Sequence, residues 1–158
     1  MRTSREQDKI TCQMGHREKD LFLEVLAFYP CTPPAHYTLS RKPGVPNAEA
    51  AQHLLDEALA EQREQNRKLL QQLMLDFARF QVQPTGLRLV LSEVDLEWLL
   101  QVLNDVRVGS WIKLGSPEDS DLITHAFDHL TDEKRPVLWA MEMSGYFQMQ
   151  FLKAVAGG

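Results

Sequence analysis

The chain has 158 residues, with 17 Lys and Arg against 22 Asp and Glu, so 17 − 22 gives a formal charge of −5. This acidic balance argues against a sequence-independent nucleic-acid binder, whose phosphate contacts require a basic surface. The length fits one domain, and 44% apolar residues suffice for a hydrophobic core. The longest mainly apolar run, residues 136–152, is interrupted by polar side chains and is shorter than the roughly 20 apolar residues of a membrane-spanning helix. We therefore expect neither nucleic acid nor a membrane as a partner.

The first residues differ in composition from the rest of the chain. Residues 1–19 carry many charges and few apolar side chains, so we expect a mobile leader there and a single helical domain over residues 20–156. No apolar stretch of the secretory type follows Met1, and the cysteines Cys12 and Cys31 are too few for a disulfide framework. These observations favour a cytoplasmic protein.

The first half of the chain predicts two helices. Apolar side chains crowd residues 20–29 until Pro30 ends a short helix, because proline removes a backbone donor. Residues 30–47 hold five of the eight prolines and form a connector. A long second helix follows, from Asn47 as its N-cap to about Phe80, since good helix formers dominate and neither glycine nor proline interrupts them.

The second half predicts further helices and one isolated strand. Residues 87–91 alternate enough for a short strand-like piece, for which the sequence offers no partner. Ser92 then caps a third helix that runs to about Leu114. An acidic loop follows, in which residues 122–130 are long enough for a small helix, and Pro136 opens a last helix. We predict an all-α fold: a single bundle of four or five helices with a long second helix, a Pro-rich connector, and the third and last helices at its centre.

A polar group interrupts the apolar stripe of the third helix. Arg107 shares a face with Leu100 and other apolar residues, and an unpaired buried charge would cost about 3–5 kcal/mol. The only acidic residue inside the apolar last helix is Glu142. We therefore predict that Arg107 forms a partly buried ion pair with Glu142 or Asp105, beside Asn104. We favour a structural role for this group, in which it fixes the register of the two helices, over a ligand-binding role.

The last helix is apolar on nearly all sides, which requires either a central position or contact with another chain. It also holds three of the six methionines, whose side chains adapt to irregular surfaces. Both interpretations stay open, and self-association into a homo-oligomer is one form of the second. The candidate anchors for a partner are Trp111, Trp139, Met141 and Tyr146.

Metal binding is the alternative interpretation. His125 and His129 are four residues apart, which on a helix places both imidazoles on one face, as in metal sites. Their surroundings lack a third ligand and the glutamate of known zinc motifs. A second set matches no standard zinc-finger spacing: Cys12, His16, Cys31 and His36. We therefore expect no cofactor or metal, and keep a small helical metal-binding protein or enzyme, using the two histidines and nearby carboxylates, as the alternative.

Catalytic signatures do not favour an enzyme. The sequence contains no Gly-x-Ser-x-Gly elbow, no phosphate-binding P-loop and no glycine fingerprint for a dinucleotide. Carboxylate pairs occur, but in an acidic loop that is ordinarily just solvated. We therefore favour a non-catalytic interaction or regulatory protein with a protein partner.

Residues 96–107, LEWLLQVLNDVR, carry a family resemblance, because a Trp is followed by Leu, Asn, Asp, Val and Arg. They resemble the largely actinobacterial domain-of-unknown-function family whose genes commonly neighbour that of the Clp protease adaptor for the N-end rule. The likeness extends to Leu138 and Trp139 and to residues 147–152, whereas residues 108–115 are longer than the family's Leu-Gly pair and the Pro-rich connector has no counterpart. The resemblance implies an all-helical cytoplasmic protein linked to regulated proteolysis, with the Clp protease machinery as partner and no catalytic residue to carry over.

Overall fold

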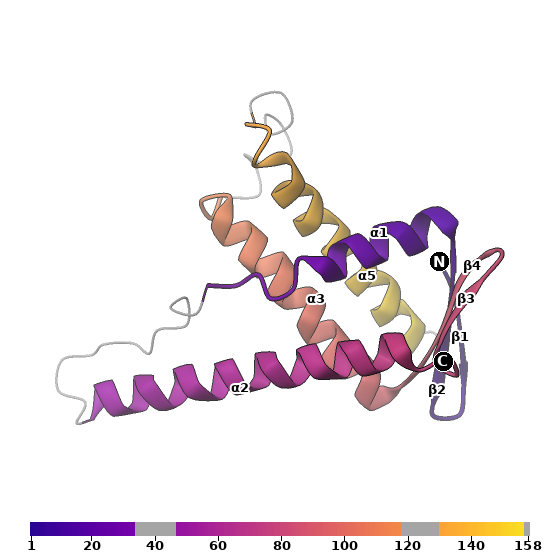
Figure 1. Cartoon of the computed structure of the whole chain (residues 1–158), viewed down its shortest axis with the longest axis horizontal. Helices are drawn as coiled ribbons and strands as arrows, with labels where there is room; N and C mark the ends of the chain where they lie inside the picture. The colour runs from indigo at the N-terminus through magenta and orange to yellow at the C-terminus, as the bar shows by residue number, and fades with distance from the viewer. Residues whose placement is uncertain (34–46, 118–129, 157–158) are drawn as a thin grey trace.

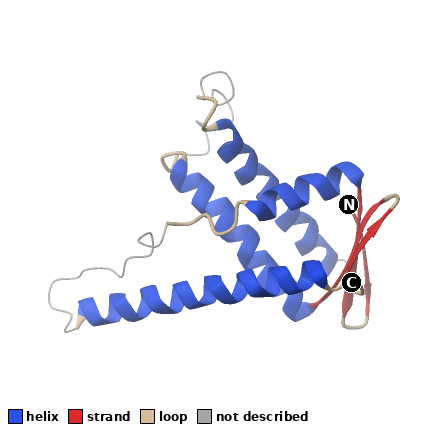
Figure 2. Cartoon of the chain, in the orientation of Figure 1, coloured by secondary structure: helices blue, strands red, loops and turns tan. Residues whose placement is uncertain are grey.

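The computed structural model of the chain describes residues 1–33, 47–117 and 130–156. In chain order the elements are β1 (Arg2–Glu6), β2 (Lys9–Gly15), α1 (His16–Ala27), α2 (Ala48–Leu75), β3 (Phe80–Gln83), β4 (Gly86–Ser92), α3 (Glu93–Lys113) and α5 (Arg135–Ala156). The strands form a small sheet at one end of the helices, and α2 extends far beyond the others (Figure 1). Figure 2 shows the helices in blue and the strands of the sheet in red.

The predicted all-α helical bundle is wrong, because the chain contains a four-stranded sheet and the fold is α+β. The strands run antiparallel in the order β1-β2-β4-β3. The strand expected at residues 87–91 is β4, and it does have partners, β2 and β3. Both strands of the first hairpin and the start of α1 lie within residues 1–19, where we expected a mobile leader outside the helical domain.

Strands β2 and β4 bury one face of the sheet. In β2 and β4 every second side chain is buried, as the two-residue period of a strand requires. Adjacent strands then bring these side chains together, and such cross-strand pairs stabilise a sheet. The buried pairs between β2 and β4 are Ile10 with Leu91, Cys12 with Leu89, and Met14 with Leu87.

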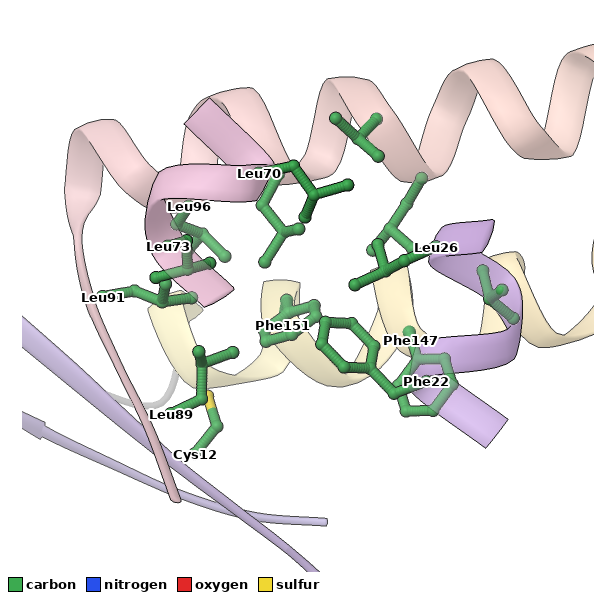
Figure 3. Close-up of a cluster of buried hydrophobic side chains, with 14 of the residues drawn as sticks. Cys12, Phe22, Leu26, Leu70, Leu73, Leu89, Leu91, Leu96, Phe147 and Phe151 are labelled. Atoms are coloured by element: carbon green, nitrogen blue, oxygen red, sulfur yellow. The ribbon is translucent and has the colours of Figure 1, made fainter. Parts of the chain in front are cut away.

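Helices α1, α3 and α5 form the rest of the core. The ring of Phe22 in α1 meets Phe147 at a centroid distance of 5.1 Å and Phe151 at 5.9 Å, both edge to face. Figure 3 shows these three rings in one cluster with Cys12 and Leu89 of the sheet. Helices α3 and α5 pack along each other more extensively than any other helix pair, as predicted.

Helix α2 is continuous, as predicted, but ends at Leu75 rather than near Phe80, which belongs to β3. Its C-terminal half packs on the core through Leu70 and Leu73. Its N-terminal half projects from the body, so that Leu54 is largely exposed.

Helix α5 has two different faces. One face is buried in the core, whereas Met149, Leu152 and Val155 are exposed. Among the described helices, α5 included, none combines the length and hydropathy needed to cross a bilayer.

The junction between β4 and α3 is held by Asp95. Its carboxylate accepts hydrogen bonds from the Ser92 backbone N–H at 3.0 Å and the Ser92 hydroxyl at 2.7 Å, which closes a capping box. Its other oxygen accepts from Arg79 at 2.9 Å and from Trp98 at 3.4 Å. Burial raises the pKa of Asp95, but these hydrogen bonds and the Arg79 charge outweigh it and hold the pKa below its usual value.

We predict that Asp95→Asn lowers the free energy of unfolding at pH 7 by about 1–2 kcal/mol, as for loss of an N-terminal cap and its charged hydrogen bonds. Because the folded-state pKa of Asp95 lies below the unfolded value of about 3.9, its contribution is complete above that value and is lost as the pH falls through the folded-state pKa. Urea unfolding at several pH values should therefore show the difference from wild type shrinking below about pH 4. The exposed Asp20→Asn is the control, and a difference that persists undiminished at pH 2 to 3 would contradict this role.

Candidate functional site

Two depressions flank α3. We call the first the α3–α5 groove: it has a volume of about 750 Å³ and is lined by Asn104, Arg107, Val108, Trp111, Met141, Glu142, Met143, Gly145, Tyr146 and Met149. We call the second the three-helix pocket: it has about 630 Å³ and is lined by Tyr29, Leu59, Gln62, Arg63, Asn66, Glu97, Leu100, Gln101, Asn104, Asp105, Gln148 and Leu152. The polar group Asn104, Asp105 and Arg107 is thereby divided, because Asp105 faces the pocket, Arg107 the groove, and Asn104 borders both.

The predicted ion pair of Arg107 does not form among the described residues. Arg107 and Glu142 are both exposed on the α3–α5 groove, and Asp105 pairs with Arg63 instead. The Arg107 side chain crosses α5 at Gly145, where a Cβ atom would lie 3.7 Å from Nε. An arginine can cover apolar surface with its stem and keep its charge in water, so this position requires no buried partner.

The apolar candidates separate into two groups. Trp111 is 37% exposed in the groove, where its Nε1 donates to the Pro117 carbonyl at 3.0 Å, and Met149 beside it is 48% exposed. Met141 lies nearly buried in the groove floor. Trp139, in contrast, does not line the groove but packs on Phe28, with ring centroids 6.3 Å apart.

Tyr146 connects the groove to α1. Its hydroxyl donates to Glu18 Oε1 at 3.1 Å. Burial, followed by the neighbouring Glu18 carboxylate, raises the pKa of Tyr146 above its usual value. Tyr146 therefore lines the groove as a neutral hydrogen-bonded ring.

Asp105 holds the segment that follows α1. Its Oδ1 accepts hydrogen bonds from the backbone N–H of Cys31 at 2.5 Å and of Thr32 at 3.2 Å. The Thr32 hydroxyl also donates, to the Asp105 backbone carbonyl at 3.0 Å. On the other side, Asp105 Oδ2 lies 3.7 Å from Arg63 Nε of α2. One carboxylate thus joins α3 to α2 and to the end of α1.

Gly109, one turn after Asp105, lets this segment approach α3. A Cβ atom at Gly109 would lie 2.4 Å from the Cys31 carbonyl carbon and 2.4 Å from the Thr32 nitrogen. No side chain fits at that distance, so the approach requires glycine at position 109. We call Asp105 and Gly109, which together receive residues 31–32, the α3 seat. The sequence did contain a signal, since a glycine inside a strongly predicted helix often marks a close approach.

The three-helix pocket has a polar lining that sequence reasoning missed. Asn66 is only 4% exposed; its Oδ1 accepts from Gln62 at 3.1 Å and its amide bonds to the Tyr29 hydroxyl. That hydroxyl donates to the Arg63 carbonyl at 3.2 Å. Burial is the main cause that raises the pKa of Tyr29, and the Asn66 amide opposes it.

Gln148 on α5 lines the same pocket. Its Oε1 is buried and has no hydrogen-bond partner in the described part of the chain. An unsatisfied buried acceptor destabilises a fold by about 1–3 kcal/mol. The signal available beforehand was a glutamine among the few polar residues of a mainly apolar helix.

The alternative metal site lies outside the described residues, because His125 and His129 fall in residues 118–129 and His36 in residues 34–46. Within residues 1–33, 47–117 and 130–156, no three His, Cys, Asp or Glu side chains are grouped to hold a metal ion. The alternative that uses His125 and His129 as ligands is therefore not tested by the described residues.

We predict that Gly109→Ala destabilises the protein by about 3 kcal/mol or more, because the new methyl group would collide with backbone. Gly145→Ala is the matched control, since it also lies inside a helix but its Cβ makes only ordinary contact with Arg107. It should be neutral or stabilising by up to about 1 kcal/mol, from helix propensity. Chemical denaturation of both variants measures the contrast, and equal stability of the two would show that residues 31–32 do not rest on α3.

We predict that Asp105→Ala costs about 3 kcal/mol of unfolding free energy, because it leaves the backbone donors of residues 31–32 and the Arg63 charge without their acceptor. Glu142→Gln should change it by less than about 0.5 kcal/mol, as for an exposed side chain with no ion pair in the described regions. Urea unfolding of the two variants tests this assignment. If Glu142→Gln lowered the unfolding free energy by more than about 0.5 kcal/mol, the result would support an ion pair between Glu142 and Arg107.

Comparison with known proteins does not assign the chain to a family. No family model, no curated protein and no solved structure matches the chain. The resemblance to the family encoded near the Clp adaptor stays a prediction from residues 96–107 and the last helix.

Proposed function

We propose that this chain is a non-catalytic, cytoplasmic interaction or regulatory protein that binds an amphipathic helix of a partner protein in the α3–α5 groove. The observation that carries this proposal is an apolar groove bordered by an exposed cation and an exposed anion that do not pair with each other. Grooves between helices receive such segments through a few apolar anchors.

The apolar part of the groove supplies the contact area. Trp111 and Met149 expose a substantial part of their surface beside the nearly buried Met141. Tryptophan is enriched among residues that dominate binding energy, and flexible methionines fit partner side chains of different shape. This composition favours binding of related apolar segments over recognition of one rigid ligand.

The charges give the groove a polarity. Arg107 belongs to α3 and Glu142 to α5, so the two helices that form the groove carry opposite charges. A bound helix should therefore place an acidic residue toward α3 and a basic residue toward α5. Charges at the rim of an interface fix orientation and partner choice more than they raise affinity.

The groove is built on rigid elements. Behind it, Val102, Leu103 and Val106 of α3 and Phe147 of α5 are completely buried. Preformed sites lose less conformational entropy on binding than mobile ones. The resemblance found in the sequence names the Clp protease machinery as the partner to test first.

We predict that a fluorescein-labelled amphipathic peptide with acidic and basic residues flanking a Leu/Met/Phe face binds in fluorescence anisotropy. Arg107→Glu should weaken this binding about tenfold, equivalent to about 1.4 kcal/mol, and Met149→Glu at least as much, because each removes a groove contact. A peptide whose acidic residue is changed to lysine should recover affinity for Arg107→Glu. Arg67→Glu, an exposed charge reversal on α2, should leave binding unchanged.

The proposal would be contradicted if both groove variants bound the peptide as tightly as wild type. It would also be contradicted if Arg107→Glu bound the lysine peptide no better than the original peptide. For the named partner, purified Clp components are passed over immobilised wild-type protein and Met149→Glu. Retention by the wild type alone supports that partner, whereas equal retention or none excludes this groove as its binding site.

A further inference from the structure

We infer that the three-helix pocket binds a small organic cation, a protonated amine on a short apolar stem. The pocket has about 630 Å³, within the range of small-molecule sites, and lies between α2, α3 and α5. Each of these helices contributes one leucine to its lining: Leu59, Leu100 and Leu152. These side chains provide the apolar surface that an alkyl stem requires.

Most polar groups of the pocket are already used by the fold. Asn66 and Tyr29 are hydrogen-bonded to Gln62, to each other and to the α2 backbone. Asp105 holds residues 31–32, and its second oxygen faces Arg63. The Arg63 charge is therefore balanced, and it does not make the pocket a site for anions.

Four lining residues form no side-chain hydrogen bond or ion pair within the described part of the chain: Glu97, Gln101, Asn104 and Gln148. Glu97 is the charged one among them, and Gln148 has the buried acceptor. Glu97 is exposed on α3, and no ion pair holds it among the described residues. Gln148 Oε1 on α5 has no partner within the same part of the chain. With Arg63 balanced by Asp105, Glu97 leaves one net negative charge in the lining.

An ammonium group fits this combination. It brings three donors and one positive charge, which suit a carboxylate and an amide oxygen in one lining. Oε1 is buried in the free protein, but the terminal torsion of glutamine is soft and allows the amide to turn toward the pocket. An anion would meet Glu97, and a neutral apolar ligand would leave both acceptors without donors.

The probe is isopentylammonium, with isopentanol as its neutral counterpart of equal shape. Titration into the full-length protein is followed by amide chemical shifts in a ¹H–¹⁵N correlation spectrum. We expect saturable binding with a dissociation constant of about 1 mM or below, as befits so small a ligand. Isopentanol should bind at least tenfold more weakly, and the shifts should centre on pocket residues such as Leu100 and Gln148.

Glu97→Gln should weaken isopentylammonium binding about tenfold and Gln148→Leu about fivefold, since each removes one acceptor. Gln148→Leu should fold at least as well as wild type, because it removes an unsatisfied buried oxygen. Glu142→Gln, an exposed carboxylate in the α3–α5 groove, is the matched control and should leave the titration unchanged.

Equal affinity for the amine and the alcohol would overturn the proposal, as would wild-type affinity in both pocket variants or no saturable binding at all. This test is independent of the proposed peptide site. Arg107 and Met149, on which that site depends, do not line the pocket.

Discussion

The arrangement of the helices depends on the close approach of residues 31–32 to α3. Gly109 removes the side chain that would prevent this approach, and Asp105 accepts the backbone donors that the approach brings to α3. The end of α1 is thereby fixed on α3, while Phe22 at its middle meets the rings of α5. Because Asp105 also faces Arg63, whose carbonyl accepts from Tyr29, the same contact places α2.

The same turn of α3 builds both the fold and the candidate sites. The Asp105 carboxylate accepts backbone hydrogen bonds in the α3 seat, and Val106 is completely buried in the core. Neither side chain is therefore available to a ligand. Arg107 points into the α3–α5 groove without a partner in the described residues, and Asn104 borders both depressions. A polar group that reads as one unit in sequence therefore has three separate surroundings, because successive residues of a helix point about 100° apart.

The sequence predicted what local patterns determine. The Ser92 cap follows from its residue type, and the continuous α2 follows from good helix formers without glycine or proline. The pairing of α3 with α5 follows from the apolar residues of each helix. The sheet did not follow, because β1 has no buried side chain and β2 pairs with β4, far along the chain. Arg107 does lie against α5, at Gly145, but it forms no ion pair with Glu142 or Asp105 in the described residues.

Both depressions share α3 and α5, so their independence depends on how rigid these two helices are. Two sites are coupled only if binding at one site shifts the protein between conformations for which the second site's ligand has different affinities. Val102, Leu103 and Val106 are completely buried in a close-packed core, and Asp105 is bonded to residues 31–32, so a shift of α3 would disturb the whole interior. Among the described residues, Asn104 is the one that lines both depressions, and its exposed side chain can change position without that cost. The groove and the pocket should therefore bind independently, except for ligands large enough to contact Asn104 from both sides.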